Sequence, residues 1–240
     1  MDGVTRDSFF NGRLRLKQPR HGYRYSIDAV ILASAVNPKP GETVVDLGTG
    51  CGVIPLILAF RRLGVHIWGV ELQAALAAVA EENVRENDMA SRVTIMCADM
   101  RDIRPERVGG PADRVVSNPP YRRGRSGRVN PDRQRALARH EIAVHLPEVV
   151  RAARTLLKTG GRFTMIYAAG RIAELLSHMR AERIEPKRLR SIHSSEEQDA
   201  RLVLVEGIRD GRPGTVVSPP LIVYDGGGRY TEEIQAMFCV

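Results

Sequence analysis

Val44-Val-Asp46-Leu-Gly48-Thr-Gly50-Cys-Gly52 is the stretch that decides the fold. Residues 43–46 predict a short buried strand, the alternating glycines predict a loop, and the apolar run 53–63 predicts a helix. A strand that enters a helix through a glycine loop lets the backbone approach a ligand closely and points the first helical N–H groups at it. The predicted ligand-binding residues of this stretch are Asp46, Gly48, Gly50 and Gly52.

The spacing of the glycines narrows the class of ligand. A dinucleotide-binding loop follows G-x-G-x-x-G and would require glycine at position 53, where this chain has Val53. Here the pattern is G-x-G-x-G, with Asp46 two residues before the first glycine. This form suits a nucleoside that carries an amino acid better than it suits a pyrophosphate.

Acidic residues also follow the next two predicted strands. Glu71 ends the strand predicted at 66–70, where a carboxylate can accept hydrogen bonds from both hydroxyls of a ribose. Asp99 comes just after the strand predicted at 93–97 and is expected to contact an adenine amino group. One such acid is more often a solvated strand end, whereas three at successive strand ends favour a ligand site. The adjoining residues Leu72 and Met100 are included in this predicted set.

Strand-like and helix-like segments alternate from residue 41 onward. The remaining predicted strands are 114–117 and 162–167, and the remaining predicted helices are 74–86, 146–157 and 172–182. This alternation predicts an α/β fold, a mostly parallel sheet with helices on both faces. Segments 189–193 and 202–206 have no helix between them and are expected to form an antiparallel hairpin.

We predict a single domain over residues 1–240. Its parts are a helical or irregular N-terminal cap (1–40), a ligand-binding catalytic core (41–207) and a C-terminal tail (208–240). The tail is rich in proline and glycine and is expected to hold one strand, at 221–224.

Composition is that of an ordinary globular protein, with 43% hydrophobic and 27% charged residues, which excludes disordered and fibrous classes. The formal net charge of +8 favours an acidic partner, nucleic acid before an anionic membrane, although a GC-rich genome would also enrich arginine. Three scattered cysteines lack metal-ligand spacing, so we expect no metal site and no disulfide scaffold. The longest apolar run, 53–60, is too short to span a bilayer, and the N-terminus lacks a signal-peptide layout. These features predict a soluble, cytoplasmic protein without membrane contact.

Asn118-Pro-Pro-Tyr121 follows the fourth predicted strand. With the glycine loop, Glu71 and Asp99, this motif resembles class I S-adenosylmethionine-dependent methyltransferases that act on amino groups. Two further stretches, Tyr25-Ser-Ile-Asp28-Ala-Val-Ile-Leu32 and Arg135-Ala-Leu-Ala-Arg-His140-Glu141, resemble the bacterial family that methylates N6 of adenine 37 in tRNA(Val).

The resemblance implies a cofactor, a partner and a topology. The cofactor would be S-adenosyl-L-methionine, and the partner would be tRNA, bound at its anticodon loop. The fold would be Rossmann-like, with a seven-stranded, mostly parallel sheet whose last strand is antiparallel. The resemblance adds Tyr25, Ser26, Asp28 and Asn118 to the predicted cofactor-binding set.

The Asn-Pro-Pro-Tyr segment suits transfer to an aromatic amine, whose lone pair is delocalised into the ring. If Asn118 Oδ1 and the Pro119 carbonyl each accept one N–H, the nitrogen can pyramidalise and direct its lone pair at the sulfonium methyl. Pro120 keeps Pro119 extended, so the carbonyl direction is set before substrate arrives. Tyr121 would stack on a target base flipped out of its strand. A double proline alone more often marks a tight loop. The predicted catalytic residues are Asn118, Pro119, Pro120 and Tyr121.

An arginine-rich loop follows the motif, with only Asp132 opposing its charge. Elsewhere in the chain such a run would be interpreted as a solvated surface. Beside the reaction site it predicts contacts with the phosphates of a nucleic acid. The predicted nucleic-acid-binding residues are Arg122, Arg123, Arg125, Arg128 and Arg133.

Methylation of adenine 37 in tRNA(Val) is the leading hypothesis, and three alternatives stay open. The substrate could be another RNA or DNA base, such as an adenine or guanine amine of ribosomal RNA. It could be a glutamine amide of a protein, against which stand the arginine-rich loop and the short segment before residue 41. The chain could also be an RNA-binding protein that keeps the fold without activity, against which stand Asp46, Glu71, Asp99 and Asn118.

Overall fold

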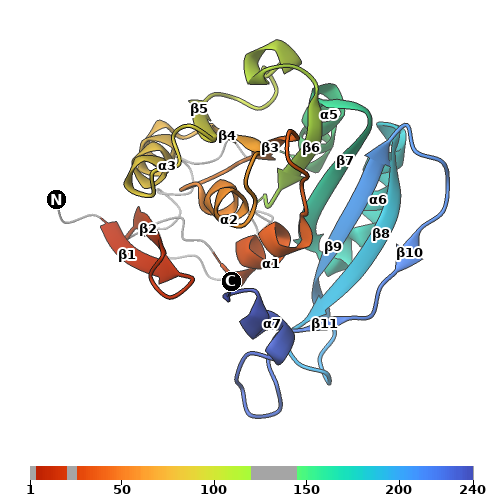
Figure 1. Cartoon of the computed structure of the whole chain (residues 1–240). Coiled ribbons are helices and arrows are strands. Elements are labelled where there is room, and N and C mark those ends of the chain that lie inside the picture. Colours follow the sequence, from red (N-terminus) through yellow and green to blue (C-terminus); the bar gives the residue numbers. More distant parts are fainter. Residues whose placement is uncertain (1–3, 21–25, 120–144, 240) are drawn as a thin grey trace, which may run out of the picture.

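The computed structural model describes residues 4–20, 26–119 and 145–239, and Figure 1 shows how they are arranged. Within these ranges a central sheet has the strand order β10-β8-β9-β7-β6-β3-β4-β5, with β11 also paired to β8, and β1 and β2 form a separate sheet. The strands are β1 (Val4–Phe9), β2 (Leu14–Pro19), β3 (Thr43–Leu47), β4 (His66–Glu71), β5 (Val93–Cys97), β6 (Ala112–Ser117), β7 (Leu157–Ala168), β8 (Ile184–His193), β9 (Ala200–Arg209), β10 (Val216–Val217) and β11 (Leu221–Ile222). The helices are α1 (Ile27–Ala35), α2 (Val53–Arg61), α3 (Ala74–Glu86), α5 (Leu146–Leu156), α6 (Ile172–Ala181) and α7 (Glu232–Ala236), with 3-10 turns η1 (Pro105–Val108) and η2 (Ala169–Arg171).

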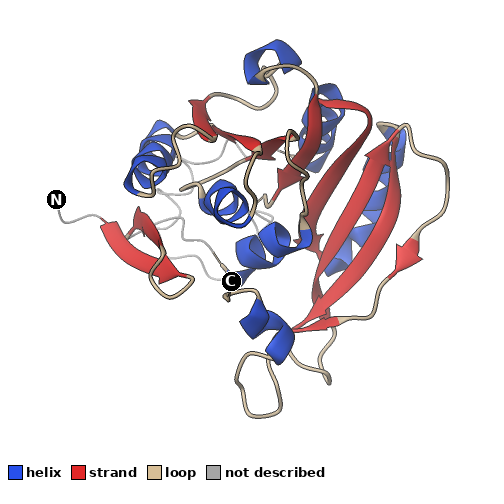
Figure 2. Ribbon diagram, viewed as in Figure 1, coloured by secondary structure: helices blue, strands red, loops and turns tan. Residues whose placement is uncertain are grey.

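The central sheet confirms the predicted α/β fold. Strands β3 to β7 pair in parallel, whereas β9 runs antiparallel to both of its neighbours, β7 and β8. The predicted hairpin is therefore β8–β9, and the seven strands β3 to β9 include an antiparallel last strand, as expected. The short strands β10 and β11 extend this arrangement by pairing in parallel with β8. Helices α1, α2 and α3 lie on one face of the sheet, and α5 and α6 lie on the other (Figures 1 and 2).

Strand β3 is the buried centre of the sheet. Val44, Val45 and Leu47 are all completely buried, although successive side chains point to opposite faces. Because helices cover both faces, both sets of side chains must be apolar. Asp46 is the exception in this strand, and it is also fully buried.

The N-terminal cap differs from the prediction of a helical or irregular segment. It contains the antiparallel hairpin β1–β2, whose register pairs Phe9 with Leu14, and the helix α1 follows it. The turn places Phe10 and Asn11 at positive φ (53° and 56°), before Gly12. Phe9, Phe10 and Leu14 are buried in the core that α1 and α2 share. Long-range packing against these helices stabilises the hairpin, and the local sequence carries no sign of such contacts.

The C-terminal tail also holds more structure than predicted. Its expected strand is shorter, because β11 covers only Leu221–Ile222, and β10 and the helix α7 were not predicted. Both short strands pair with β8, which provides their hydrogen bonds. Ile234 of α7 is completely buried in the core of the α1–α2 face.

Candidate cofactor and catalytic site

Four of the predicted site residues, Asp46, Glu71, Asp99 and Asn118, lie at one edge of the sheet. Strands β3, β4, β5 and β6 are parallel, so their carboxyl ends meet at the same edge. After β3 the chain builds the sheet in one direction through β4 and β5, and then in the other direction through β6 and β7. Ligands of open α/β sheets bind at such a switch point, outside the carboxyl ends of the strands. Asp46, Glu71, Asp99 and Asn118 all lie at or just after these ends.

The glycine loop needs left-handed backbone at each of its three glycines. Gly48, Gly50 and Gly52 have φ values of 78°, 58° and 84°, which residues with a Cβ adopt at a cost. The backbone amides of Gly48 and Thr49 both donate to the Val70 carbonyl, at 2.9 and 3.0 Å, so the loop is tied to β4. A methyl group at Gly52 would lie 3.2 Å from the Ala80 Cβ of α3. The glycines therefore allow both the turn and the close approach of α3.

Asp46 is a buried carboxylate without a hydrogen-bond donor. Its exposed fraction is 0%, and neither oxygen accepts a hydrogen bond of standard geometry from the described residues. Burial raises the pKa of Asp46 to about 7, with part of the effect offset by the Thr49 hydroxyl and a smaller addition from the charge of Glu71. A buried carboxylate without donors is unfavourable. Asp46 is therefore suited to a ligand that brings a cation or hydrogen-bond donors to the loop.

Glu71, at the end of β4, is buried, and each of its carboxylate oxygens accepts one hydrogen bond from the backbone. Its Oε2 accepts a hydrogen bond from the Gly50 amide at 2.8 Å, and its Oε1 accepts one from the Gln73 amide at 2.9 Å. Each carboxylate oxygen can accept a second hydrogen bond. This arrangement orients both oxygens and leaves acceptor capacity for the two hydroxyls of a ribose.

Asp99 has a partner that the sequence interpretation missed. The Arg101 guanidinium donates from Nε to both carboxylate oxygens at 3.0 Å and from Nη2 to Oδ2 at 2.5 Å, and the Arg101 amide donates to Oδ1 at 2.9 Å. These hydrogen bonds hold the pKa of Asp99 below its usual value. Asp99 is therefore an ionised acceptor, as its predicted contact with an adenine amino group requires. The sequence feature that could have indicated this ion pair is the short spacing, since Arg101 comes two residues after Asp99.

Met100 and Leu72 adjoin the two acids. A methyl group at Gly48 would lie 3.9 Å from the Met100 Cε, so this buried side chain lies next to the first glycine of the loop. Leu72 directly follows Glu71 and is half-buried. Met100 therefore provides apolar surface beside the glycine loop, and the contact of Met100 and Leu72 with a nucleoside stays a prediction.

Ser26 and Asp28 begin helix α1. Ala35, at the far end of this helix, lines a pocket with Glu42 and Arg114 at the starts of β3 and β6. The buried residues of α1 pack in the core that this helix shares with α2, and the approach of Ser26 and Asp28 to the glycine loop stays a prediction. Burial raises the pKa of Asp28, and the Ser26 hydroxyl offsets part of this effect. The predicted neighbour Tyr25 lies outside the described residues.

Asn118 and Pro119 follow β6 directly. The Ser117 hydroxyl donates to the Leu47 carbonyl at 2.8 Å, which joins the ends of β6 and β3. Asn118 is half-buried and Pro119 is buried. The rest of the predicted catalytic and nucleic-acid-binding set lies outside the described residues: Pro120, Tyr121, Arg122, Arg123, Arg125, Arg128 and Arg133.

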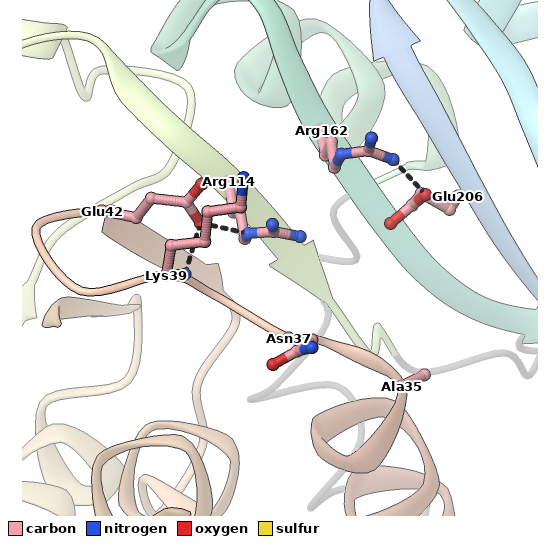
Figure 3. Close-up of a pocket in the computed structure, with 7 residues that line it drawn as sticks. All are labelled: Ala35, Asn37, Lys39, Glu42, Arg114, Arg162 and Glu206. Carbon is pink, nitrogen blue, oxygen red and sulfur yellow. Dashed lines mark hydrogen bonds and ion pairs between the residues drawn. The ribbon is translucent and has the colours of Figure 1, made fainter. Parts of the chain in front are cut away.

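A polar pocket of about 290 Å³ lies away from this edge, near the amino ends of β3 and β6 (Figure 3). Its charged side chains are largely paired with one another. Arg114 donates to Glu42 and Arg162 donates to Glu206, both at 2.6 Å. None of the predicted site residues lines this pocket. These ion pairs connect neighbouring strands and the start of β3, and we assign the pocket no part in the site.

The described residues show neither a membrane-spanning helix nor a cluster of metal ligands. Among the described helices, none is long and apolar enough to cross a membrane. Over the same described residues, histidine, cysteine and acidic side chains form no group of three or more that could hold a metal ion.

Known proteins of similar sequence identify the family of this chain. The sequence pattern of the methyltransferase small domain family matches residues 25–179, a span that includes the glycine loop and all four strand ends. The chain belongs to this family. It is a methyltransferase with a class I, Rossmann-like α/β fold.

Two relatives resemble this methyltransferase over nearly their whole length. The tRNA1(Val) (adenine(37)-N6)-methyltransferase of Porphyromonas gingivalis is 29% identical over 239 residues, which cover 95% of this chain and 91% of the relative. The protein of the same name from Pedobacter heparinus is 25% identical and is matched over 97% and 96% of the two chains.

Solved structures share the fold. A protein described as a predicted O-methyltransferase from Agrobacterium tumefaciens superposes with a TM-score of 0.70 at 23% identity, over 88% of this chain and 94% of the other. Geranyl diphosphate C-methyltransferase from Streptomyces coelicolor, solved with S-adenosyl-L-homocysteine, has a TM-score of 0.54 at 18% identity, over 75% and 78% of the two chains. At these identities the similarity concerns the fold alone.

Proposed function

We propose that this methyltransferase uses S-adenosyl-L-methionine to methylate an exocyclic amine, N6 of adenine 37 in tRNA(Val). The observation that carries the cofactor assignment is the buried Asp46 carboxylate, which has no donor and lies beside a loop of left-handed glycines. The substrate assignment is supported by relatives of that name, which match more than nine-tenths of both chains. A tRNA substrate also agrees with the predicted cytoplasmic location.

The residues present fit this cofactor. Asp46 would hold the ammonium group of its methionine part, because the buried carboxylate lacks a donor. Glu71 would accept hydrogen bonds from the ribose hydroxyls, and Asp99 would accept one from the adenine amine. Gly48, Gly50 and Gly52 leave the loop without side chains that would obstruct the ligand. Ser26, Asp28, Leu72, Met100 and the neighbouring Tyr25 would complete the walls.

The bound cofactor supplies an electrophilic methyl group on a sulfonium sulfur. The protein therefore has to position the amine, and we assign this role to the segment after β6. Asn118 Oδ1 and the Pro119 carbonyl would accept the two N–H groups and turn the nitrogen lone pair toward the methyl group. Catalysis of this kind depends on orientation and fixed dipoles, and it needs no strong general base.

Substrate binding would require a flipped base and contacts to the RNA backbone. In this proposal Tyr121 stacks on the flipped adenine, with Pro120 holding the turn. Arg122, Arg123, Arg125, Arg128 and Arg133 would contact phosphates, since guanidinium groups suit bidentate contacts to phosphate oxygens.

The test is methyl transfer from labelled S-adenosyl-L-methionine to total RNA and total protein from cells that lack the modification. We expect label in N6-methyladenosine of the tRNA fraction, identified by mass spectrometry of nucleosides and mapped to position 37 of tRNA(Val). The Asn118→Ala protein is the control for contaminating activity. Label in ribosomal RNA, DNA or glutamine would overturn the substrate assignment, and absence of cofactor binding would overturn the proposal as a whole.

A further inference from the structure

Asn83 of helix α3 joins two separate parts of the molecule through one buried side chain. Its exposed fraction is 0%. The amide oxygen accepts a hydrogen bond from the Lys17 backbone N–H at 2.7 Å, and the amide nitrogen donates to the Lys17 carbonyl at 2.8 Å. The same nitrogen donates to the Cys51 carbonyl of the glycine loop at 2.9 Å. Asn83 is therefore bonded both to strand β2 and to the loop.

Asn87 repeats the contact to β2 one helical turn later. The Arg15 backbone N–H donates to its Oδ1 at 2.9 Å, and its Nδ2 donates to the Arg15 carbonyl at 2.7 Å. Four residues of helix advance about 6 Å and two residues of strand advance about 6.6 Å, so the two amides match alternate residues of β2. Each asparagine side chain thus accepts one backbone N–H of β2 and donates to the carbonyl of the same residue, as the backbone of a neighbouring strand would.

The two asparagines differ in one respect. The side chain of Asn87, the residue that follows α3, also donates to the Asn83 carbonyl at 2.7 Å, whereas the side chain of Asn83 donates to the glycine loop. Cys51 is completely buried and lies between Gly50 and Gly52. Helix α3 therefore contacts this part of the loop at two successive positions of one face, by packing of Ala80 against Gly52 and by the hydrogen bond from Asn83.

We propose that Asn83 is a positioning residue for the cofactor: it holds the glycine loop in its ligand-binding conformation and couples it to the N-terminal hairpin. The hydrogen bond to Cys51 fixes the peptide that precedes Gly52, where the chain turns into α2. The Gly50 amide, which donates to the Glu71 carboxylate, lies one residue before Cys51, so the Asn83 hydrogen bond and the Glu71 hydrogen bond hold adjacent residues of the loop. This inference rests on the proposed function, since the ligand of the loop is taken to be S-adenosyl-L-methionine.

The test compares Asn83→Ala with the matched control Asn87→Ala. Both variants lose the two hydrogen bonds to the backbone of β2, but only Asn83→Ala loses the bond to the loop. We expect Asn83→Ala to raise the Kd for S-adenosyl-L-methionine, measured by calorimetry, by roughly tenfold, and Asn87→Ala to change it by less than about twofold. In the ligand-free protein, amide hydrogen exchange at residues 48–52 should accelerate only in Asn83→Ala.

Equal effects of the two alanine variants on Kd and loop exchange would overturn the proposal, because the effect would then pass through the hairpin. An unchanged Kd in Asn83→Ala would do so as well. A wild-type protein that binds neither S-adenosyl-L-methionine nor S-adenosyl-L-homocysteine would overturn the proposed function, and this inference with it. The wild-type measurement thus separates the two failures.

Asn83→Asp provides a second variant if the alanine protein does not fold. A protonated aspartic acid keeps one O–H donor at this buried position, and the ionised form keeps none. We expect the ratio of the Kd of Asn83→Asp to that of the wild type to rise with pH. The same ratio for Asn87→Asp, at a more exposed position, should stay flat. A flat ratio for Asn83→Asp would contradict the positioning role.

Discussion

Asp46 and Glu71 lie at the carboxyl ends of neighbouring strands of the sheet, yet only Glu71 accepts hydrogen bonds of standard geometry from the described residues. Glu71 accepts the Gly50 and Gln73 amides, while both oxygens of the buried Asp46 have no donor among the described residues. The glycine loop therefore satisfies one carboxylate and leaves the other to the ligand. Glu71 therefore holds the glycine loop in place, whereas the charge of Asp46 is balanced only when a ligand binds.

The first prediction concerns pH and the stability of the ligand-free protein. Burial raises the pKa of Asp46 in the folded protein to about 7, above the ordinary value of 3.8 for aspartate, so the folded state holds this proton more tightly than the unfolded chain. The contribution of this proton to the free energy of unfolding is complete below about pH 4 and is lost as the pH rises through about 7. The loss lowers the free energy of unfolding by as much as about 4 kcal/mol. Asp46→Asn should remove this loss and unfold at higher denaturant concentration than the wild type at pH 8. Identical pH dependence in the two proteins would contradict the prediction.

Asp46→Asn should also lose cofactor affinity, in contrast to its gain in stability. The neutral amide removes the charge that balances the ammonium group, and hydrogen bonds to charged groups contribute about 1.5–3 kcal/mol. We expect a rise in the Kd for S-adenosyl-L-methionine of roughly tenfold or more, measured by calorimetry at pH 8. Affinity equal to that of the wild type would assign the ammonium group to another residue.

Asn118→Ala should abolish transfer and spare cofactor binding. Loss of one oriented acceptor for the amine is expected to lower kcat by roughly 100-fold or more, as for other preorganised polar groups. The Kd for the cofactor should stay within about threefold of the wild-type value, because the amine is not part of the cofactor. Single-turnover kinetics together with calorimetry measure both quantities. A large loss of cofactor affinity would instead show that the main role of Asn118 is the cofactor contact that the resemblance also implies for it.

Arg122→Ala combined with Arg123→Ala should weaken RNA binding and reduce its dependence on salt. Each phosphate contact that is lost lowers the slope of log K against log salt concentration by about 1. Fluorescence anisotropy with labelled tRNA at several salt concentrations measures this slope. The cofactor Kd serves as the control and should not change. An unaltered slope would contradict phosphate contacts by Arg122 and Arg123 and would favour the interpretation of the arginine-rich loop as a solvated surface.

Gly52→Ala tests the close approach of α3 to the glycine loop. Gly41 is a matched control, since both glycines have φ of 84° but only Gly52 would place a methyl group against Ala80, at 3.2 Å. Gly41→Ala should lower the free energy of unfolding by about 1–2 kcal/mol through backbone strain alone. Gly52→Ala should cost about 1 kcal/mol more and weaken cofactor binding, measured by chemical denaturation and calorimetry. If both variants lose the same free energy of unfolding, Ala80 moves aside for the added methyl group without loss of stability, and the close approach of α3 does not require glycine at position 52.

Much of the fold could be predicted from local pattern. The helix at 74–86 and the strand at 93–97 have the predicted bounds, because the spacing of apolar residues in the helix and the short, mainly apolar run in the strand are patterns of consecutive residues. The β8–β9 hairpin followed from the absence of a helix between two apolar segments. Asp46, Glu71 and Asp99 could be assigned to one edge because parallel strands place their carboxyl ends together.

The sequence by itself thus determined the class of fold, the ligand-binding edge and the residue types placed on it. Only the tertiary structure decided how these residues are partnered. It left Asp46 without a donor, paired Asp99 with Arg101, and placed Asn83 of α3 between Lys17 and Cys51. The N-terminal hairpin was missed for the same reason, since its edge is satisfied by side chains about 70 residues away along the chain. Periodicity records which face of an element is buried, whereas hydrogen-bond partners depend on which elements fold against each other.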